Sequence, residues 1–168
     1  IVLGTGLLPL PNWSGGPLLA ACAMLVTICL VDDRFDLSPW TRLSVQITAA
    51  LTLILGAGTT VASLGAPFGQ PISLSETSSY VITAISMIAA INAFNMLDGM
   101  DGLAGALAMV ALIALAFLAS SSGHTAALAI SVVIMAAVAA FLLSNLPIDF
   151  NRNVRCFMGD SGSTLLGI

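Results

Sequence analysis

The longest group of side chains that could do chemistry lies near the middle of the chain, in NAFNMLDGMDGLAG, residues 92–105. Polar side chains recur there at every third residue: Asn92, Asn95, Asp98 and Asp101. On a helix, each step of three residues turns about 300°, so these side chains would form one slowly drifting polar stripe. Gly99 and Gly102 allow the backbone to unwind or to approach a ligand. A helix C-cap would explain one Asp-Gly pair, but not two pairs and two upstream asparagines.

Two adjacent carboxylates form the second group, because Asp32 and Asp33 directly follow the apolar residues Leu30 and Val31. Ionised groups at the edge of an apolar segment are expensive unless they are paired or bind a metal. Two like charges this close need a cation. The alternative is that the arginines nearby neutralise them as an interfacial anchor, namely Arg34 and Arg42.

The third group is FMGDSGS, in which Asp160 stands between two glycines just before a short apolar stretch. Ser161 and Ser163 suit N-capping of a helix that begins there, and capping alone is one interpretation. The other is that the N–H groups of a helix N-terminus bind phosphate while the carboxylate holds the accompanying metal. Arg152 and Arg155 would add donors for an anion, although basic loops also arise from membrane topology alone.

The composition excludes a soluble domain of average usage. The 168 residues are 58% hydrophobic and 7% charged, with a mean hydropathy of +1.08,. The apolar stretches are continuous rather than alternating, which argues against an outer-membrane barrel. The three cysteines show no metal-binding spacing, and we interpret Cys22 and Cys29 as small hydrophobic residues,.

The gaps between charged residues predict where the helices cross the membrane. Uncharged stretches end at Val31, run from Leu43 to about Gly58 and from about Tyr80 to Leu97, and leave room for two spans between Asp101 and Asp149,. We therefore predict an all-α, polytopic transmembrane helix bundle of about five complete spans. Partial helices at both ends indicate one integral membrane catalytic domain over residues 1–168, truncated at both termini.

If each stretch crosses once, all three groups emerge on one side of the membrane. Glu76 and His124 then lie on the opposite side, while every arginine accompanies the acids. An excess of arginine in short loops marks the cytoplasmic face. Oxygen ligands with hardly any histidine or thiol among them favour Mg²⁺ over zinc. An ion-coupled transporter, the competing class, would instead carry acids in the middle of its spans.

The motifs DDRFDL, NAFNMLDGMDGLAG and FMGDSGSTLLG, in this order, resemble those of the bacterial polyprenyl-phosphate N-acetylhexosamine 1-phosphate transferases. The resemblance covers nearly the whole chain. It is strongest to the branch that moves GlcNAc 1-phosphate from UDP-GlcNAc to undecaprenyl phosphate. The branch that transfers phospho-MurNAc-pentapeptide typically carries a lysine three residues after its Asp pair, where this chain has Asp36.

The resemblance implies a role for each matching residue. Asp32, Asp33 and Asp160 would be catalytic, with Asp32 and Asp33 beside the lipid phosphate and Asp160 and Asp33 as ligands of Mg²⁺, or of Mn²⁺ as an alternative. The UDP-sugar would contact a larger set: Asn92, Asn95, Asp98, Asp101, Asn145, Phe157, Arg152 and Arg155. Within that set, Phe157 would stack on the uracil ring and Asn145 would contact the nucleotide.

The resemblance also implies the reaction and its setting. A polyprenyl phosphate and a UDP-sugar would react at the cytoplasmic face of a bacterial plasma membrane, giving polyprenyl-diphosphate-sugar and UMP, without a nucleic acid partner. This would be the first membrane step of a cell-envelope glycan. Phospho-MurNAc-pentapeptide, other hexosamines and a homodimeric state stay open. The family's His-rich loop would follow Ile168, so we expect this chain to be a piece of a longer enzyme.

Overall fold

The computed structural model describes residues 15–66, 69–100, 102–145 and 157–168. These residues form helices joined by turns, with one isolated antiparallel bridge between Ser63 and Ser73. The helices are, in chain order, α1 (Gly16–Phe35), α2 (Pro39–Ala57), α3 (Glu76–Leu97), α4 (Leu103–Ser121), α5 (Thr125–Asn145) and α6 (Gly159–Leu166). Their architecture confirms the predicted all-α membrane fold.

Four of the described helices, α2 to α5, are long and apolar enough to cross a membrane. Helix α1 has the length of a span at 20 residues, but charged residues occupy its last turn: Asp32, Asp33 and Arg34. The remaining predicted span, the first along the chain, is therefore helix α1, whose apolar part ends at Val31. Its carboxyl end is polar, as the sequence predicts.

The chain divides into two compact units. The four-helix unit, residues Gly15–Met96 and Gly159–Ile168, contains α1, α2, nearly all of α3, and α6. The hairpin unit consists of the described residues within Leu97–Met158 and contains α4 and α5. The expectation of a single catalytic domain over residues 1–168 stays a prediction.

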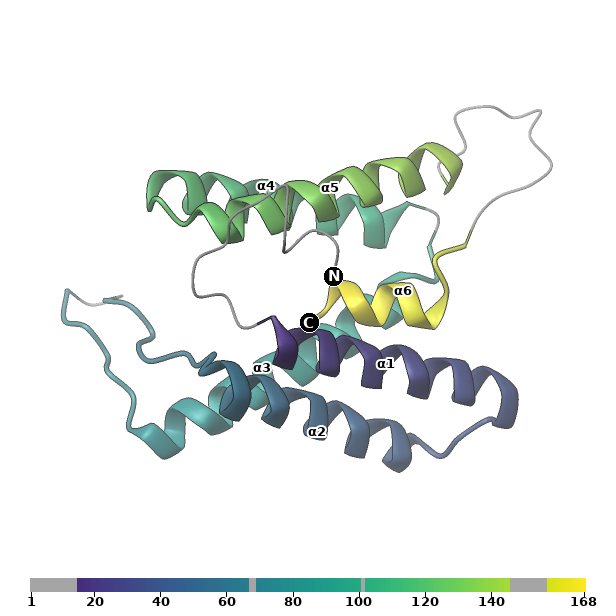
Figure 1. Cartoon of the computed structure of the whole chain (residues 1–168), viewed down its shortest axis with the longest axis horizontal. Helices are drawn as coiled ribbons and strands as arrows, with labels where there is room; N and C mark the ends of the chain where they lie inside the picture. Colours follow the sequence, from purple (N-terminus) through teal and green to yellow (C-terminus); the bar gives the residue numbers. More distant parts are fainter. Residues whose placement is uncertain (1–14, 67–68, 101, 146–156) are drawn as a thin grey trace. The chain divides into compact units, whose positions relative to one another are not determined.

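In the four-helix unit, α1 and α2 run antiparallel and side by side, joined by a short turn (Figure 1). Ser38 caps α2 by accepting a hydrogen bond from Thr41 N–H, and Pro39 occupies the first turn, where its missing N–H costs nothing,. This cap begins α2 four residues earlier than the predicted span. Residues from three helices form the apolar core of the unit: Ala21, Leu25, Ala49, Leu53 and Ile91.

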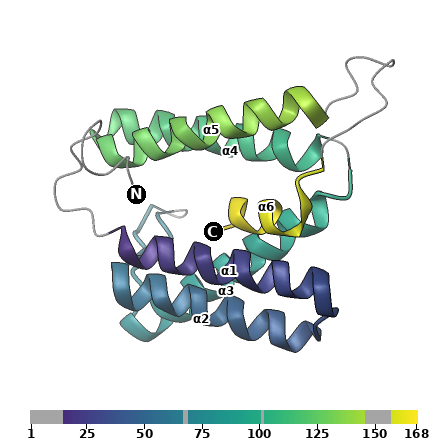
Figure 2. The ribbon, with the colours of Figure 1, turned by 45° about the vertical axis from the view of Figure 1, so that its right-hand side comes forward.

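Helix α6 lies along α1, as Figure 2 shows, and its C-terminal residues approach α3 closely. A side chain at Gly167 would overlap the backbone of Ile91, so only glycine fits there. Ile168 packs against the same core. The close approach places the C-terminal end of α6 against the middle of the unit and leaves its N-terminal end, with Asp160, beside the polar end of α1.

In the hairpin unit, α4 and α5 lie side by side and are joined by the turn that the sequence predicts at residues 120–124. Gly123 has a φ of +71°, a conformation that favours glycine,. A Cβ at Gly105 on α4 would meet the side chain of Leu142 on α5. Small residues at such contacts let membrane helices pack tightly.

Two local predictions are wrong. Helix α3 ends at Leu97, so Asn92 and Asn95 share a helix while Asp98 lies in the turn that follows, and no continuous helical stripe forms. A turn follows at residues 98–100, and Gly102, with a φ of +74°, stands at the start of the next helix. Ser163 does not cap α6, because the helix begins earlier, at Gly159, and the Ser163 hydroxyl donates back to carbonyl oxygens of its own first turn.

Hydroxyl side chains on α2 bond to the helix that carries them. Ser44 donates to the carbonyl oxygen of Trp40, Thr48 to that of Ser44, and Thr52 to that of Thr48, each at 2.8 Å. These hydroxyl donors are satisfied within the helix, without water or a partner helix.

Candidate active site

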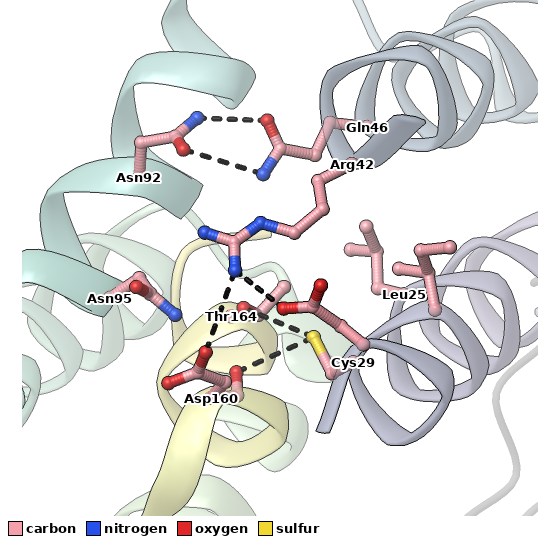
Figure 3. Close-up of a pocket in the computed structure, with 10 residues that line it drawn as sticks. Leu25, Cys29, Arg42, Gln46, Asn92, Asn95, Asp160 and Thr164 are labelled. Carbon is pink, nitrogen blue, oxygen red and sulfur yellow. Dashed lines mark hydrogen bonds and ion pairs between the residues drawn. The ribbon is translucent and has the colours of Figure 1, made fainter. Parts of the chain in front are cut away.

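A polar pocket lies within the four-helix unit, where the C-terminal halves of α1 and α3 meet the N-terminal ends of α2 and α6 (Figure 3). We call it the Arg42 pocket. Each of the four helices contributes two of its polar lining residues: Cys29 and Asp32, Arg42 and Gln46, Asn92 and Asn95, Asp160 and Thr164. Two apolar residues of α1, Leu25 and Ile28, complete the lining. The pocket thus joins parts of the chain more than a hundred residues apart.

Arg42 is the cation of this pocket. Its Nη1 atom lies 2.5 Å from Oδ2 of Asp32 and 3.9 Å from Oδ2 of Asp160, so one guanidinium faces carboxylates from two other helices. The contact with Asp32 is a charge-assisted hydrogen bond, and the longer one to Asp160 is a looser ion pair,. Pairing of Asp32 with Arg42, one of the two interpretations left open by the sequence, is thus observed, and metal binding by the Asp pair stays a prediction.

The backbone after α1 holds Asp32 in place. The Leu37 N–H donates to Oδ1 of Asp32 at 2.8 Å, and Asp36, in the left-handed conformation, ends the helix by donating its N–H to the Asp32 carbonyl. With Arg42 on the other oxygen, the Asp32 side chain is only 10% exposed. The hydrogen bond from Arg42 is the main cause that lowers the pKa of Asp32 below its usual value, so this carboxyl is ionised at neutral pH,.

Cys29 contacts α6 from its position on α1. Its thiol is within hydrogen-bonding distance of the Asp160 carbonyl oxygen, at 3.7 Å, and of Thr164 Oγ1, at 3.6 Å. The first turn of α6 is therefore held at the polar end of α1, which places the Asp160 carboxylate in the pocket. The predicted role of Cys29 as a small hydrophobic residue accounts for its burial but misses this contact.

An amide pair connects α2 and α3 at the other wall of the pocket. Asn92 Nδ2 donates to Gln46 Oε1 at 2.8 Å, and Gln46 Nε2 donates to Asn92 Oδ1 at 3.4 Å. One turn further along α3, Asn95 points into the pocket (Figure 3). The asparagines of the central motif thus differ, since one bonds to a neighbouring helix and the next faces the pocket space.

The structure brings together four of the predicted site residues: Asp32, Asp160, Asn92 and Asn95. Asp33 is exposed and does not line the pocket, because adjacent residues of a helix point about 100° apart,. Asp98 and Phe157 belong to the hairpin unit, and Phe157 is 72% exposed. Three predicted residues lie outside the described residues: Asp101, Arg152 and Arg155.

Asn145, predicted to contact a nucleotide, has a clear structural partner in the hairpin unit. Its Oδ1 accepts a hydrogen bond from the backbone N–H of Gly102, the residue that precedes α4. Asn145 is buried at the end of α5. It therefore ties the end of α5 to the turn that carries the Asp-Gly pairs.

Sequence reasoning assigned no substrate role to Arg42 and gave Gln46 no role at all. The signal that could have found them is their spacing of four residues, which puts both on one face of α2. Ser38 and Pro39 mark the start of that helix in the sequence. Placing the helix start there would have put Arg42 on the helix rather than in the preceding loop.

The donors of the pocket suit a hard cation. Asp160 and the amide side chain of Asn95 supply oxygen ligands, and Thr164 adds a hydroxyl,. Among the described residues, no three carboxylate, histidine or cysteine side chains gather into a metal cage. An ion such as Mg²⁺, which keeps several waters and is bound through one or two carboxylates plus substrate phosphates, fits this donor set.

The space inside the pocket is small. It amounts to about 20 Å³, enough for one water or one ion but not for a nucleotide,.

Comparison with known proteins identifies relatives of this chain. The curated relatives include enzymes from Yersinia pestis (38% identical over 149 residues), Escherichia coli K12 (36% over 149) and Haemophilus influenzae (38% over 145). Each is named undecaprenyl-phosphate alpha-N-acetylglucosaminyl 1-phosphate transferase. The matches cover 86–89% of this chain but only 40–41% of the relatives, so the chain spans about two fifths of their length. No solved structure matches the chain.

The family comparison covers the pocket in full. The glycosyl transferase family 4 profile matches residues 17–168, a range that includes every residue of the Arg42 pocket. The chain belongs to glycosyl transferase family 4.

Proposed function

We propose that the protein containing this chain transfers a sugar 1-phosphate, GlcNAc 1-phosphate in the first place, from a UDP-sugar to undecaprenyl phosphate or a similar polyprenyl phosphate. The observation that carries the proposal is the meeting of Arg42, Asp32 and Asp160 at one polar pocket of an apolar helical unit. The relatives' names supply the substrates, and the family supplies the reaction class.

The chemistry is an exchange at phosphorus. A phosphate oxygen of the lipid attacks the β-phosphorus of the UDP-sugar, and the bond from that phosphorus to the oxygen bridging the two phosphates breaks. UMP leaves with the electron pair, and the sugar remains on the new lipid diphosphate. The attacking phosphate is already largely ionised near neutral pH, so the protein's main tasks are to position the reactants and to neutralise charge.

Arg42 is the residue placed to bind an anionic phosphate. Its looser contact, to Asp160 at 3.9 Å, is the one that an entering phosphate would replace, while the bond to Asp32 keeps the guanidinium oriented,. Asp32 then acts chiefly by holding Arg42. Asn95, facing the same space, can donate an amide hydrogen to a sugar or phosphate oxygen,.

Asp160 is the carboxylate of the pocket that would hold Mg²⁺. It is about half exposed, and Arg42 contacts it only at long range. A bound Mg²⁺ would neutralise charge on the phosphates as they react. The predicted second ligand, Asp33, lies outside the pocket lining and stays a prediction.

We place the pocket at the cytoplasmic face of a bacterial plasma membrane. The polar ends of α1 and α3 and the beginning of α2 lie together in the four-helix unit, and the two described arginines, Arg34 and Arg42, belong to these ends of α1 and α2. An excess of arginine in short loops supports the cytoplasmic side. UDP-sugars are supplied on that side.

The test is release of UMP by the full-length protein in detergent, with undecaprenyl phosphate, Mg²⁺ and one UDP-sugar at a time. Release with UDP-GlcNAc, lost in Asp160→Asn and without Mg²⁺, is the expected result. Release only with UDP-MurNAc-pentapeptide or another UDP-hexosamine would replace the proposed sugar. Silence of a well-folded preparation with every UDP-sugar would overturn the proposed reaction.

A further inference from the structure

The amide pair between α2 and α3 leaves Asn92 little capacity to bind a substrate. Its Nδ2 donates to Gln46 Oε1 at 2.8 Å and to the carbonyl oxygen of Ile88, one turn back on α3, also at 2.8 Å. An amide nitrogen carries two hydrogens, and both are used. Its Oδ1 accepts from Gln46 Nε2 at 3.4 Å. Asn92 therefore has no amide hydrogen left for a UDP-sugar.

Gln46 is the buried member of the pair. It is 9% exposed and stands on the face of α2 that packs toward the unit's interior, one turn after Arg42. A buried primary amide needs hydrogen-bond partners, and Asn92 provides both a donor and an acceptor. The pair therefore has a single well-defined geometry, with each side chain fixed by the other.

The amide pair lies where it can constrain the orientation of α3. The preceding residue, Ile91, lies in the apolar core and its backbone touches Gly167, so α3 is packed closely at this level. The directional hydrogen bonds between Gln46 and Asn92, one residue further along α3, add a constraint on how α3 is rotated about its own axis,.

Asn95 follows Asn92 by three residues and stands on nearly the same face of α3. Figure 3 shows Asn95 pointing into the pocket while Asn92 faces Gln46. We propose that Gln46 is a positioning residue: through Asn92 it sets the rotation of α3 that presents Asn95 to the substrate. The proposal deepens the proposed function and rests on it.

Gln46 and Arg42 share a face of α2, so one helix fixes both the phosphate-binding guanidinium and the asparagine that works beside it,. Arg42 and the amide partner of Asn92 thus lie one turn apart on the same helix beside the pocket.

The experiment compares three variants of the full-length protein in detergent: Gln46→Met, Asn92→Leu and the exchanged pair Gln46→Asn/Asn92→Gln. Methionine keeps the length of glutamine without its amide, and the exchanged pair keeps two amides across the same gap. Steady-state UMP release gives kcat and KM, and thermal unfolding reports whether each variant is folded.

We expect kcat of Gln46→Met and of Asn92→Leu to fall by at least about ten-fold, with KM for UDP-GlcNAc changing far less, because misplacing a positioned group affects the transition state most. The exchanged pair should regain a large part of the lost kcat. If Asn92 only contacted the substrate, exchanging the two amides would not restore kcat, so this recovery distinguishes positioning from direct contact.

Three outcomes would overturn the proposal. Gln46→Met could keep wild-type kcat, the exchanged pair could be no better than the single variants, or kcat per folded molecule could stay constant while only thermal stability falls. A rise of KM in Asn92→Leu with normal kinetics in Gln46→Met would instead make Asn92 a direct substrate contact. If wild-type protein releases no UMP, the proposed function fails as well, which separates the two.

Discussion

Arg42 stands between Asp32 and Asp160, in close contact with the first and 3.9 Å from the second. A positive side chain thus lies next to the carboxylate that would hold a metal. This relationship makes the residues around the pocket interdependent, because a change to one alters the charge felt by the others.

Replacing Arg42 by glutamine removes a positive charge near Asp160. We expect Mn²⁺ to bind the substrate-free protein more tightly, by roughly ten-fold, because repulsion between the guanidinium and the ion is lost. Titration of the full-length protein followed by the Mn²⁺ electron paramagnetic resonance signal measures this. The matched control is Arg34→Gln, an exposed arginine that does not line the pocket and should leave the affinity unchanged. Equal affinities in wild type and Arg42→Gln would contradict the expectation.

The same substitution should impair transfer. A hydrogen bond to a charged group contributes about 1.5–3 kcal/mol, so we expect kcat/KM of Arg42→Gln to fall by roughly ten- to a hundred-fold. Arg42→Lys keeps the charge but not the forked geometry and should fall in between. Steady-state UMP release checks both variants. A fully active Arg42→Gln would exclude Arg42 from phosphate binding.

The Asp32 pKa predicts how one part of the stability depends on pH. Because the folded-state pKa is lowered by Arg42, the Asp32–Arg42 interaction stabilises the fold fully above the usual aspartate pKa of about 3.9,. That stabilisation is lost as the pH falls through the lowered value. The difference in unfolding temperature between wild type and Asp32→Asn, measured in EDTA, should be constant from pH 8 to about pH 5 and shrink below about pH 4. A difference that shrinks already between pH 7 and pH 6 would show that another group controls it.

Gly167→Ala tests the close approach of α6 and α3. An added Cβ would overlap the backbone of Ile91, which cannot move as a flexible side chain end could. We expect a loss of about 1–3 kcal/mol in stability, seen as a lower unfolding temperature. Gly16→Ala is the matched control, since nothing lies within 4 Å of a Cβ there. If both substitutions lower the unfolding temperature equally, the close approach is not what makes glycine necessary at position 167.

Asn145 can be tested for its two roles with a matched pair of substitutions. Asn145→Asp keeps the oxygen that accepts from Gly102 N–H, whereas Asn145→Leu leaves that N–H without it. We expect Asn145→Leu to lose about 1–3 kcal/mol of stability. Asn145→Asp keeps the acceptor but buries a charge in place of the amide, so it should also be less stable than wild type. A higher KM for UDP-GlcNAc in the folded fraction of Asn145→Asp would support the predicted nucleotide contact in addition.

Much of this architecture follows from residue patterns. Uncharged stretches of span length predict the helices, and the single crossing of each stretch predicts that Asp32, Asn95 and Asp160 emerge together. Charge spacing could not show that Arg42 would reach Asp160, because the contact depends on α6 lying against α1, where Cys29 contacts the first turn of α6. The hydrogen bonds between Asn92 and Gln46 could not be predicted from the sequence either, since they depend on which faces of α2 and α3 meet.

The hydroxyl side chains along α2 have a consequence for how the chain enters the bilayer. Helix α2 has the lowest hydropathy of the four candidate spans, 1.2, partly because it contains Ser44, Thr48 and Thr52. Each of these hydroxyls donates to a carbonyl of its own helix. A hydropathy scale assigns each serine and threonine the cost of removing a free hydroxyl from water, although these three hydroxyls are already hydrogen-bonded within the helix. We therefore expect the insertion machinery to accept α2 as a membrane-spanning segment more readily than its hydropathy suggests, without help from a neighbouring span.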